Sequence, residues 1–430
     1  MDYIKNRKEK WNIFVMKHIA IYLLLTTFLS GQTAFDYPPL NYASTEMNND
    51  AETLLKKINN GETKLKKDDK YGYLPALLKA LDIPASSQVL VFSQTSFQKE
   101  NIDIKNPRAL YFNERNYVGK VQNSEVLEIA SYDANNGAVF YTLEESKEKK
   151  LRLLRNDEDC LNCHSSFRTQ SVPGIMLRSI FLNKEDSLKS RTVTHRTPLN
   201  ERWGSWYVTG DLNKNEHLGN IINSKGQEQE HKNIDSLKEF FDTDKYLLDQ
   251  SDVIALMILE HQAHMTNLIT RANFRTRVTL HRQKELNKDM QKSADHISEY
   301  AMRDIARNGD SLVRYLLFSE EAKLNSPITG SEKYVSNFQK NAVKDSKGRS
   351  LKDLNLKSRL LEYPCSYMIY SQNFEALPKV MKDYIYKKLY GVLTGKDKSE
   401  EFQHLNAEMR QAILEILLDT KKDLPDYWKE

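Results

Sequence analysis

The chain has 430 residues, which is long enough for two domains with hydrophobic cores. Its 63 basic and 59 acidic residues leave a formal net charge of +4, and so small a surplus predicts no nucleic-acid partner. With a hydrophobic content of 40% and an aromatic content of 10%, the composition predicts a folded globular protein.

Residues 1–34 have the order of a secretory signal. A basic segment is followed by an apolar run from Ile19 to Leu29 and then by small residues from Ser30 to Ala34. The run is short for a membrane span, which needs about 20 residues. An uncleaved anchor stays open as the alternative, because residues 13–16 extend the apolar stretch beyond Lys17. We therefore expect an exported, periplasmic protein, with any membrane association only through this segment.

The next part of the chain predicts a flexible lead-in and then a β-rich domain. Residues 35–65 are polar and contain consecutive prolines, so we expect a flexible segment there. Residues 66–228 carry short alternating runs that are typical of antiparallel strands. Strands are expected at residues 88–93, 109–112, 117–119, 127–132, 138–143, 175–181 and 205–209. Asn136 and Gly137, between two of these runs, are typical of a β-hairpin turn.

A five-residue motif in the β-rich part of the chain predicts the chemistry of the protein. Residues 160–164 read Cys-Leu-Asn-Cys-His, which is the C-x-x-C-H pattern that attaches c-type haem. Thiols at positions i and i+3 of a helix share a face and can bond the same porphyrin, and the histidine that follows supplies an axial iron ligand. The residues before it, 156–159, suit a helix N-terminus, where a side-chain oxygen caps free N–H groups. We therefore expect one haem c per chain, bound covalently to Cys160 and Cys163, with His164 as the proximal ligand.

Two other uses of paired thiols stay open, namely a redox dithiol and half of a zinc site. A zinc site usually needs a second pair of ligands, and only Cys365 remains of the 3 cysteines. A thioredoxin-like dithiol follows a strand in a βαβ unit, which the acidic run before Cys160 does not resemble. Cys365 lies among aromatic residues, so we expect it to be buried and inert.

From residue 229 onward the apolar period changes to three and four, which predicts a helical domain at 229–430. Helices are expected at residues 252–274, 380–393 and 407–418. On the first of these, His261 falls on the apolar stripe. The neighbouring stripe is polar and consists of Glu260, His264, Asn267 and Arg271. The expected fold class is therefore α+β, with a β-rich N-terminal half that carries the haem-binding turn and a mainly α-helical C-terminal half.

The sixth iron ligand decides what such a haem does. A strong ligand makes an electron carrier, and an open position makes a site for catalysis or gas binding. His261, His217 and His195 are candidates for a distal ligand or a distal acid–base group, although each can equally be a core or loop histidine. Three arginines are candidates for pairing with the haem propionates, because a guanidinium matches a carboxylate: Arg168, Arg178 and Arg196.

The chain resembles a family of exported bacterial proteins with a cytochrome c domain and a single C-x-x-C-H haem motif. The resemblance covers nearly everything after the signal region. It rests on the segments at 106–119, 137–145, 157–174, 195–210, 260–274, 363–371 and 424–428. The family implies haem binding and electron transfer, with Cys160, Cys163 and His164 as its site residues. A second likeness, in the order of sheet and motif alone, is to the lysine-cross-linked haem c enzymes that oxidise hydroxylamine.

The sequence thus favours an exported single-haem c-type cytochrome that passes electrons to a redox partner protein. One haem in 430 residues is a large protein for a shuttle, so two alternatives stay open. The first is a haem c enzyme whose open sixth position acts on a small molecule such as a peroxide or a nitrogen oxide. The second is a haem-based sensor whose helical half binds a partner.

Overall fold

The computed structural model describes residues 34–145, 151–182, 187–221 and 233–429. Residues 1–33 of the expected signal segment lie outside these ranges. Within them, no helix is long and apolar enough to cross a membrane. The described residues up to Thr45 belong to a small unit of turns that contains a short 3₁₀ helix, Tyr42–Ser44. The backbone N–H of Ala43 donates to the carboxylate of Asp36 at 3.1 Å within this unit. The residues from Glu46 onward form the second unit, which holds all the other elements.

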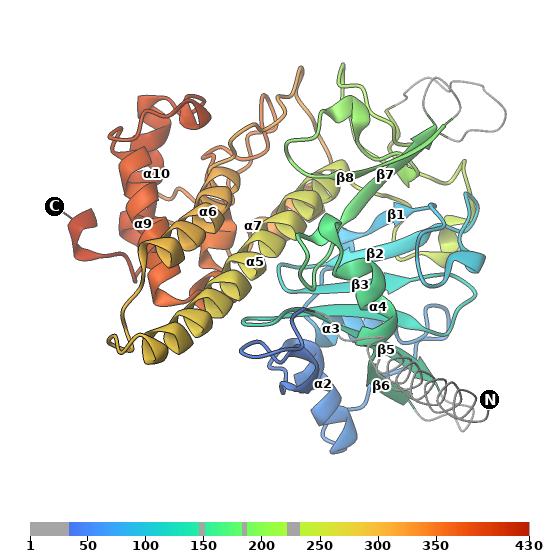
Figure 1. Ribbon diagram of the computed structural model, residues 1–430. Coiled ribbons are helices and arrows are strands. Elements are labelled where there is room, and N and C mark those ends of the chain that lie inside the picture. The colour runs from blue at the N-terminus through green and yellow to red at the C-terminus, as the bar shows by residue number, and fades with distance from the viewer. Residues whose placement is uncertain (1–33, 146–150, 183–186, 222–232, 430) are drawn as a thin grey trace, which may run out of the picture. The chain divides into compact units, whose positions relative to one another are not determined.

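A seven-stranded antiparallel sheet occupies the first half of the second unit (Figure 1). Its strand order is β6-β5-β4-β3-β2-β1-β9. The strands are β1 (Val89–Val91), β2 (Arg108–Phe112), β3 (Asn116–Lys120), β4 (Leu127–Asp133), β5 (Gly137–Glu145), β6 (Leu151–Arg155) and β9 (Trp206–Tyr207). A separate hairpin consists of β7 (Leu177–Leu182) and β8 (Leu188–Val193). The expected turn before Gly137 connects β4 to β5, and Gly137 has a φ of 77°, which favours glycine.

Helices cover both faces of the sheet. The residues before and in α2 (Asp50–Asn59) contact one face, where the Asn49 amide donates to the Tyr141 hydroxyl at 3.0 Å. The 37-residue helix α5 (Val253–Asp289) contacts the other face, where the Gln262 amide donates to the Tyr117 hydroxyl at 3.0 Å. Side chains alternate between faces along a strand, so these contacts assign opposite faces of the sheet to α2 and α5. Figure 1 shows α5 running between the sheet and the remaining helices.

The other helices pack around α5 and complete the core. They are α6 (Glu299–Leu316), α7 (Glu332–Gln339), α8 (Gln372–Glu375), α9 (Lys379–Leu393) and α10 (Ala407–Thr420), while α3 (Leu74–Ala80) precedes the sheet. Asp252 caps α5, as expected, because its Oδ1 accepts from the Ala255 N–H at 2.9 Å. Cys365 is fully buried in this core, as expected, and burial raises the pKa of its thiol.

The α+β fold class is confirmed, with the sheet at 89–207 and the helices mainly at 253–420. Two expected boundaries differ from the structure. The lead-in expected at 35–65 contains α2, whose Ala51 and Leu54 side chains are buried. The β-rich and helical parts expected at 66–228 and 229–430 belong to one compact unit, because α5 buries residues against both the sheet and the helices.

Candidate haem-attachment site

The C-x-x-C-H string forms a short helix, α4 (Asp157–His164), directly after edge strand β6. Three acidic residues, 157–159, occupy its first turn, as the dipole favours. The side chain of Asn156 does not cap the helix, contrary to the sequence expectation for this segment. Asp157 instead ties the helix to the sheet, because its Oδ1 accepts from the Phe140 N–H at 3.1 Å and its Oδ2 pairs with Arg155. The sheet therefore fixes where α4 begins.

The two thiols of α4 are free and accessible. Cys160 is partly buried, Cys163 is exposed, and no residue of α4 is buried. Burial, together with the nearby Glu128 and Asp157 carboxylates, raises the pKa of Cys160 to about 12. A thiol that stays protonated at neutral pH is a poor redox nucleophile, which counts against the dithiol alternative. The described residues contain no group of three or more metal-ligating side chains.

His164 is held in the tautomer that an iron ligand needs. Its Nδ1 lies 2.8 Å from the carbonyl oxygen of Gly174. A carbonyl can only accept, so Nδ1 carries the hydrogen and the lone pair is on Nε2. No hydrogen bond within the described ranges engages Nε2. Burial and the Arg108 charge lower the pKa of His164, which favours the neutral imidazole. Metal-ligating histidines in general show this arrangement.

Gly174 is itself fixed by helix α5. Its N–H donates back to the His164 carbonyl at 2.9 Å. The Asn267 amide of α5 donates to the carbonyl of Ile175 at 2.8 Å, and Tyr132 of β4 accepts from the Ile175 N–H at 3.1 Å. A Cβ atom at position 174 would lie 2.0 Å from Asn267 Oδ1, so only glycine allows this approach. The hydrogen bonds from Asn267 to Ile175 and from His164 to Gly174 thus connect helix α5 to the histidine of the motif.

The sheet beneath α4 carries a charged pair. Arg108 of β2 pairs with Glu128 of β4, and the Arg108 guanidinium lies against Gly119 of β3, where a Cβ would meet it. Both charges are close enough to shift the pKa of Cys160 and of His164. The buried Nε atom of Arg108 has no hydrogen-bond partner in the described part of the chain. The Arg108 Nε–H group, next to the motif, can therefore donate a further hydrogen bond.

Large apolar side chains are exposed around the same helix. Phe167, three residues after His164, is 74% exposed, and Leu154 of β6 is 44% exposed. Phe97 is 68% exposed, and its neighbours Ser96 and Gln98 both hydrogen-bond to Glu128. Apolar surface gathered at one place marks a ligand or partner site. A porphyrin has the large apolar surface that such a place would cover.

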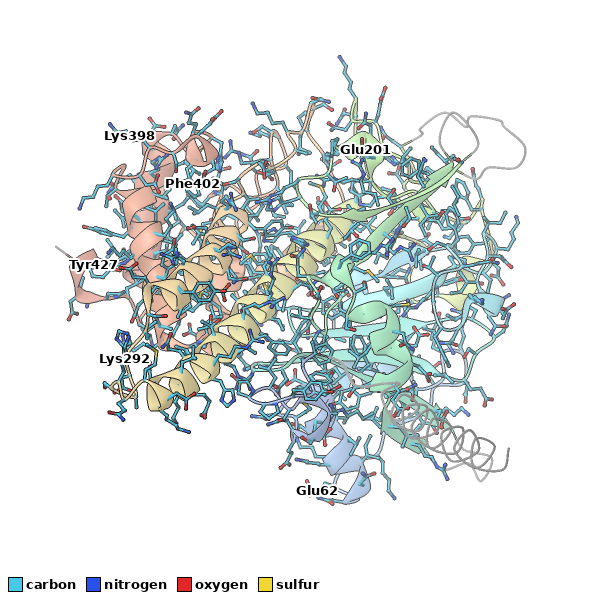
Figure 2. All side chains as sticks on the ribbon, viewed as in Figure 1. Glu62, Glu201, Lys292, Lys398, Phe402 and Tyr427 are labelled. Atoms are coloured by element: carbon cyan, nitrogen blue, oxygen red, sulfur yellow. The ribbon has the colours of Figure 1, made fainter. Side chains whose placement is uncertain are left out.

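Two of the three nominated arginines lie near each other, and one of them, Arg178, lies near Cys163. Arg168 stacks over the Phe167 ring at 4.6 Å, and Arg178 donates to Ser190 Oγ of β8 at 2.8 and 3.0 Å. Arg178 interacts electrostatically with Arg168 and with Cys163. Neither arginine has a carboxylate partner among the described residues. In contrast, Arg191 on the same hairpin pairs with Glu201, which is labelled in Figure 2. Arg168 and Arg178 are therefore free to pair with the carboxylates of a ligand.

The structure buries two of the nominated histidines in the interior and places the third arginine, which is partly exposed, beside them. His195 Nδ1 lies 2.9 Å from His261 Nδ1, and Arg196 contacts the Tyr315 ring in the same region. No hydrogen bond or ring contact joins His195 or His261 to α4 in the described residues. His217 is buried, packs edge-on against Trp203 and accepts from the Gly219 N–H at 3.0 Å. A distal role for these three histidines stays a prediction.

Sequence reasoning missed Gly174, Arg108 and Glu128 as neighbours of the motif. The Pro173-Gly174 pair, ten positions after His164, was an available signal for a turn that brings a carbonyl close to the motif. Comparison of the chain with models of known protein families, with curated proteins and with solved structures finds no match. The family resemblance noted in the sequence therefore stays a prediction.

Proposed function

We propose that this protein is a single-haem c-type cytochrome that transfers electrons to a redox partner protein. The observation that carries the proposal is the His164 imidazole, oriented by the Gly174 carbonyl at the end of a C-x-x-C helix. When bound, haem c supplies a one-electron couple. Cys160 and Cys163 would hold the porphyrin through two thioethers, and His164 would bind its iron through Nε2.

The other residues of the site fit the same group. Phe167, Leu154 and Phe97 offer apolar surface for the porphyrin faces and edges. Arg168 and Arg178 offer two uncompensated guanidinium groups for its carboxylates. Cys163 and Phe167 are exposed, so the bound group would have an edge that a partner protein can approach. Export through the N-terminal segment would bring the chain to the compartment where haem c is attached.

A second candidate function is catalysis or gas binding at an open iron. One observation favours it, namely that His195 and His261 are hydrogen-bonded to each other in the interior and do not contact α4. If the two histidines keep this hydrogen bond when haem is bound, neither would be free to fill the sixth position. A methionine or histidine from elsewhere in the chain that bound the sixth position would instead favour electron transfer.

Optical and EPR spectra test both candidates. The full chain is expressed with haem-maturation genes, and carbon monoxide is added to the reduced protein. A low-spin spectrum that carbon monoxide leaves unchanged indicates two strong ligands and electron transfer, and a high-spin spectrum that shifts indicates an open iron. Absence of covalent haem from the wild-type protein overturns the proposal. The Cys160→Ala/Cys163→Ala double variant serves as the control that cannot form thioethers.

A further inference from the structure

A second polar cluster lies in the interior, around the segment that follows α6. His195 stacks on the Tyr315 ring at 3.8 Å and on the Phe318 ring at 4.6 Å. His261 stacks on Phe318 at 4.5 Å, and the two histidines hydrogen-bond through their Nδ1 atoms. His264 contacts the other side of the cluster, with its ring 4.6 Å from Tyr315. Two histidines are therefore held rigidly between aromatic rings.

Hydrogen bonding assigns the tautomers of the two histidines. Ser366 Oγ lies 2.8 Å from His261 Nε2 and accepts from the Met368 N–H at 3.3 Å. If His261 donated to it as well, the Ser366 hydroxyl hydrogen would have no acceptor, so Ser366 is the donor. His261 Nδ1–H then donates to His195 Nδ1, and His195 carries its remaining hydrogen on Nε2. Burial lowers the pKa of both histidines, so both are neutral.

The cluster has several buried polar atoms with no partner in the described residues. They are His195 Nε2, His264 Nδ1, Arg196 Nη2, Ser319 Oγ and the Tyr315 hydroxyl. Each of these side chains contacts the segment 315–319 or belongs to it, and Arg196 Nε donates to the Ser319 carbonyl at 3.1 Å. Buried polar groups nearly always have a partner, either in the protein or as ordered water or ligand, so several of them together are able to bind one.

The chemistry of these atoms favours an anion. Arg196 Nη2 and His195 Nε2 can only donate, and the Ser319 hydroxyl can donate as well. The one carboxylate that pairs with Arg196, that of Glu320 at 3.2 Å, is 71% exposed, so screening by water leaves the guanidinium charge partly uncompensated. An anion would also balance the Arg196 charge, which a neutral water molecule would not. The His195 and His264 rings contact the Tyr315 ring at 3.8 and 4.6 Å, and such close packing favours a ligand of few atoms.

We propose that Arg196, His195, His264 and Ser319 form a binding site for a small inorganic anion, which we name the Arg196 site. The Arg196 side chain is 33% exposed and pairs with the exposed Glu320, which gives the anion a path from solvent. Phe318 and Glu320 both have positive φ values, of 58° and 65°, and the backbone is thereby turned so that Ser319 lies beside Arg196. The proposal does not depend on haem, because the site contains none of the residues of α4.

Bromide is a suitable probe, because it binds as a chloride-like anion and scatters anomalously. We would titrate the full chain with sodium bromide by calorimetry in a gluconate buffer and locate bromide in soaked crystals. The expected result is one saturable site with density within hydrogen-bond distance of Arg196 Nη2. Arg196→Gln should weaken binding at least about tenfold, because a charge-assisted hydrogen bond is lost, and Ser319→Ala about threefold.

Arg115→Gln is the matched control. The Arg115 side chain is 41% exposed and pairs with Asp50 at 3.1 Å, so its loss should leave bromide affinity within about twofold. The proposal is overturned if the wild-type chain shows no saturable binding, if only water occupies the site, or if Arg196→Gln binds bromide as the wild type does. Should Arg196→Gln fail to fold, Arg196→Lys and Ser319→Ala decide, and unchanged affinity in both overturns the proposal.

Discussion

Gly174 offers the sharpest test of how helix α5 positions the motif histidine. A methyl group there would lie 2.0 Å from Asn267 Oδ1 and 2.8 Å from its Cγ. Asn267 is 1% exposed and cannot move without losing its hydrogen bonds to Ile175 and Tyr132. Overpacking costs about 1–3 kcal/mol, and leaving a buried polar group unsatisfied costs about 1–3 kcal/mol. We therefore expect Gly174→Ala to lower the free energy of unfolding by about 2–6 kcal/mol.

Urea unfolding followed by far-UV circular dichroism measures this effect. Gly391→Ala is the control, since a Cβ there meets its nearest neighbour, Asp397 Cβ, at 3.8 Å. Gly391 lies within α9, where alanine should stabilise by up to about 1 kcal/mol. Asn267→Ala removes the colliding atoms, so the double variant with Gly174→Ala should lose at least about 1 kcal/mol less than the sum of the single losses. Additive losses, or a Gly174→Ala no worse than Gly391→Ala, would refute the reasoning.

Three further predictions concern other parts of the molecule. Lowering the pH from 7.5 to 5.0 should destabilise the fold by about 2 kcal/mol through His261, because burial lowers its folded pKa to about 3 and the unfolded state, with a pKa near 6.5, takes up the proton. Urea midpoints of the wild type and of His261→Gln at both pH values measure this loss, which is absent above pH 6.5. Arg202→Met should cost about 3–5 kcal/mol because it leaves the buried Glu260 carboxylate without its partner, and Glu260→Leu in the same chain should recover part of that loss in urea unfolding. In the haem-loaded protein, Arg178→Gln should lower the reduction potential by about 20–60 mV in a redox titration, because a positive charge near the haem is removed.

For each of these three predictions, one result would contradict the reasoning. An exposed histidine on the same helix provides the control for pH, so His281→Gln should keep the wild-type loss of stability, and a His261→Gln that keeps it too contradicts the assignment. An Arg202→Met that unfolds at the wild-type urea concentration would contradict a buried ion pair. Arg191→Gln, on the same hairpin as Arg178, removes a charge already paired with Glu201. An equal shift in both arginine variants would contradict a specific role for Arg178.

Local patterns predicted most of the sheet because its strands alternate strongly. Strands β6 and β8 were missed, because only Leu153 of β6 is buried and Leu188 to Arg191 of β8 are all exposed, which weakens the apolar alternation. Helix α5 was expected to end near residue 274 but continues to Asp289. Beyond that point its residues are mostly exposed, and the apolar stripe that marked the helix fades. The helical period could predict the type of this element but not its length.

Part of the candidate site could be predicted from local sequence, and the rest depends on tertiary contacts. Cys160, Cys163 and His164 were identified from their spacing alone, and the structure adds an accessible helix with free thiols. The Gly174 carbonyl is ten residues away and reaches His164 only because Asn267, far along the chain, fixes the turn. The polar stripe of α5 was visible in the sequence, but its packing against the residues that follow the motif was not. Contacts across 66 residues, as between His195 and His261, depend on the whole fold.

The central claim is that the two thiols of α4 carry a haem. Peptide mass mapping of the chain, expressed with haem-maturation genes, tests it most directly. We predict that the peptide containing residues 160–164 carries the mass of one haem and resists removal of that group by acidified organic solvent. A peptide with two free thiols, or a haem that the solvent extracts, would contradict the claim.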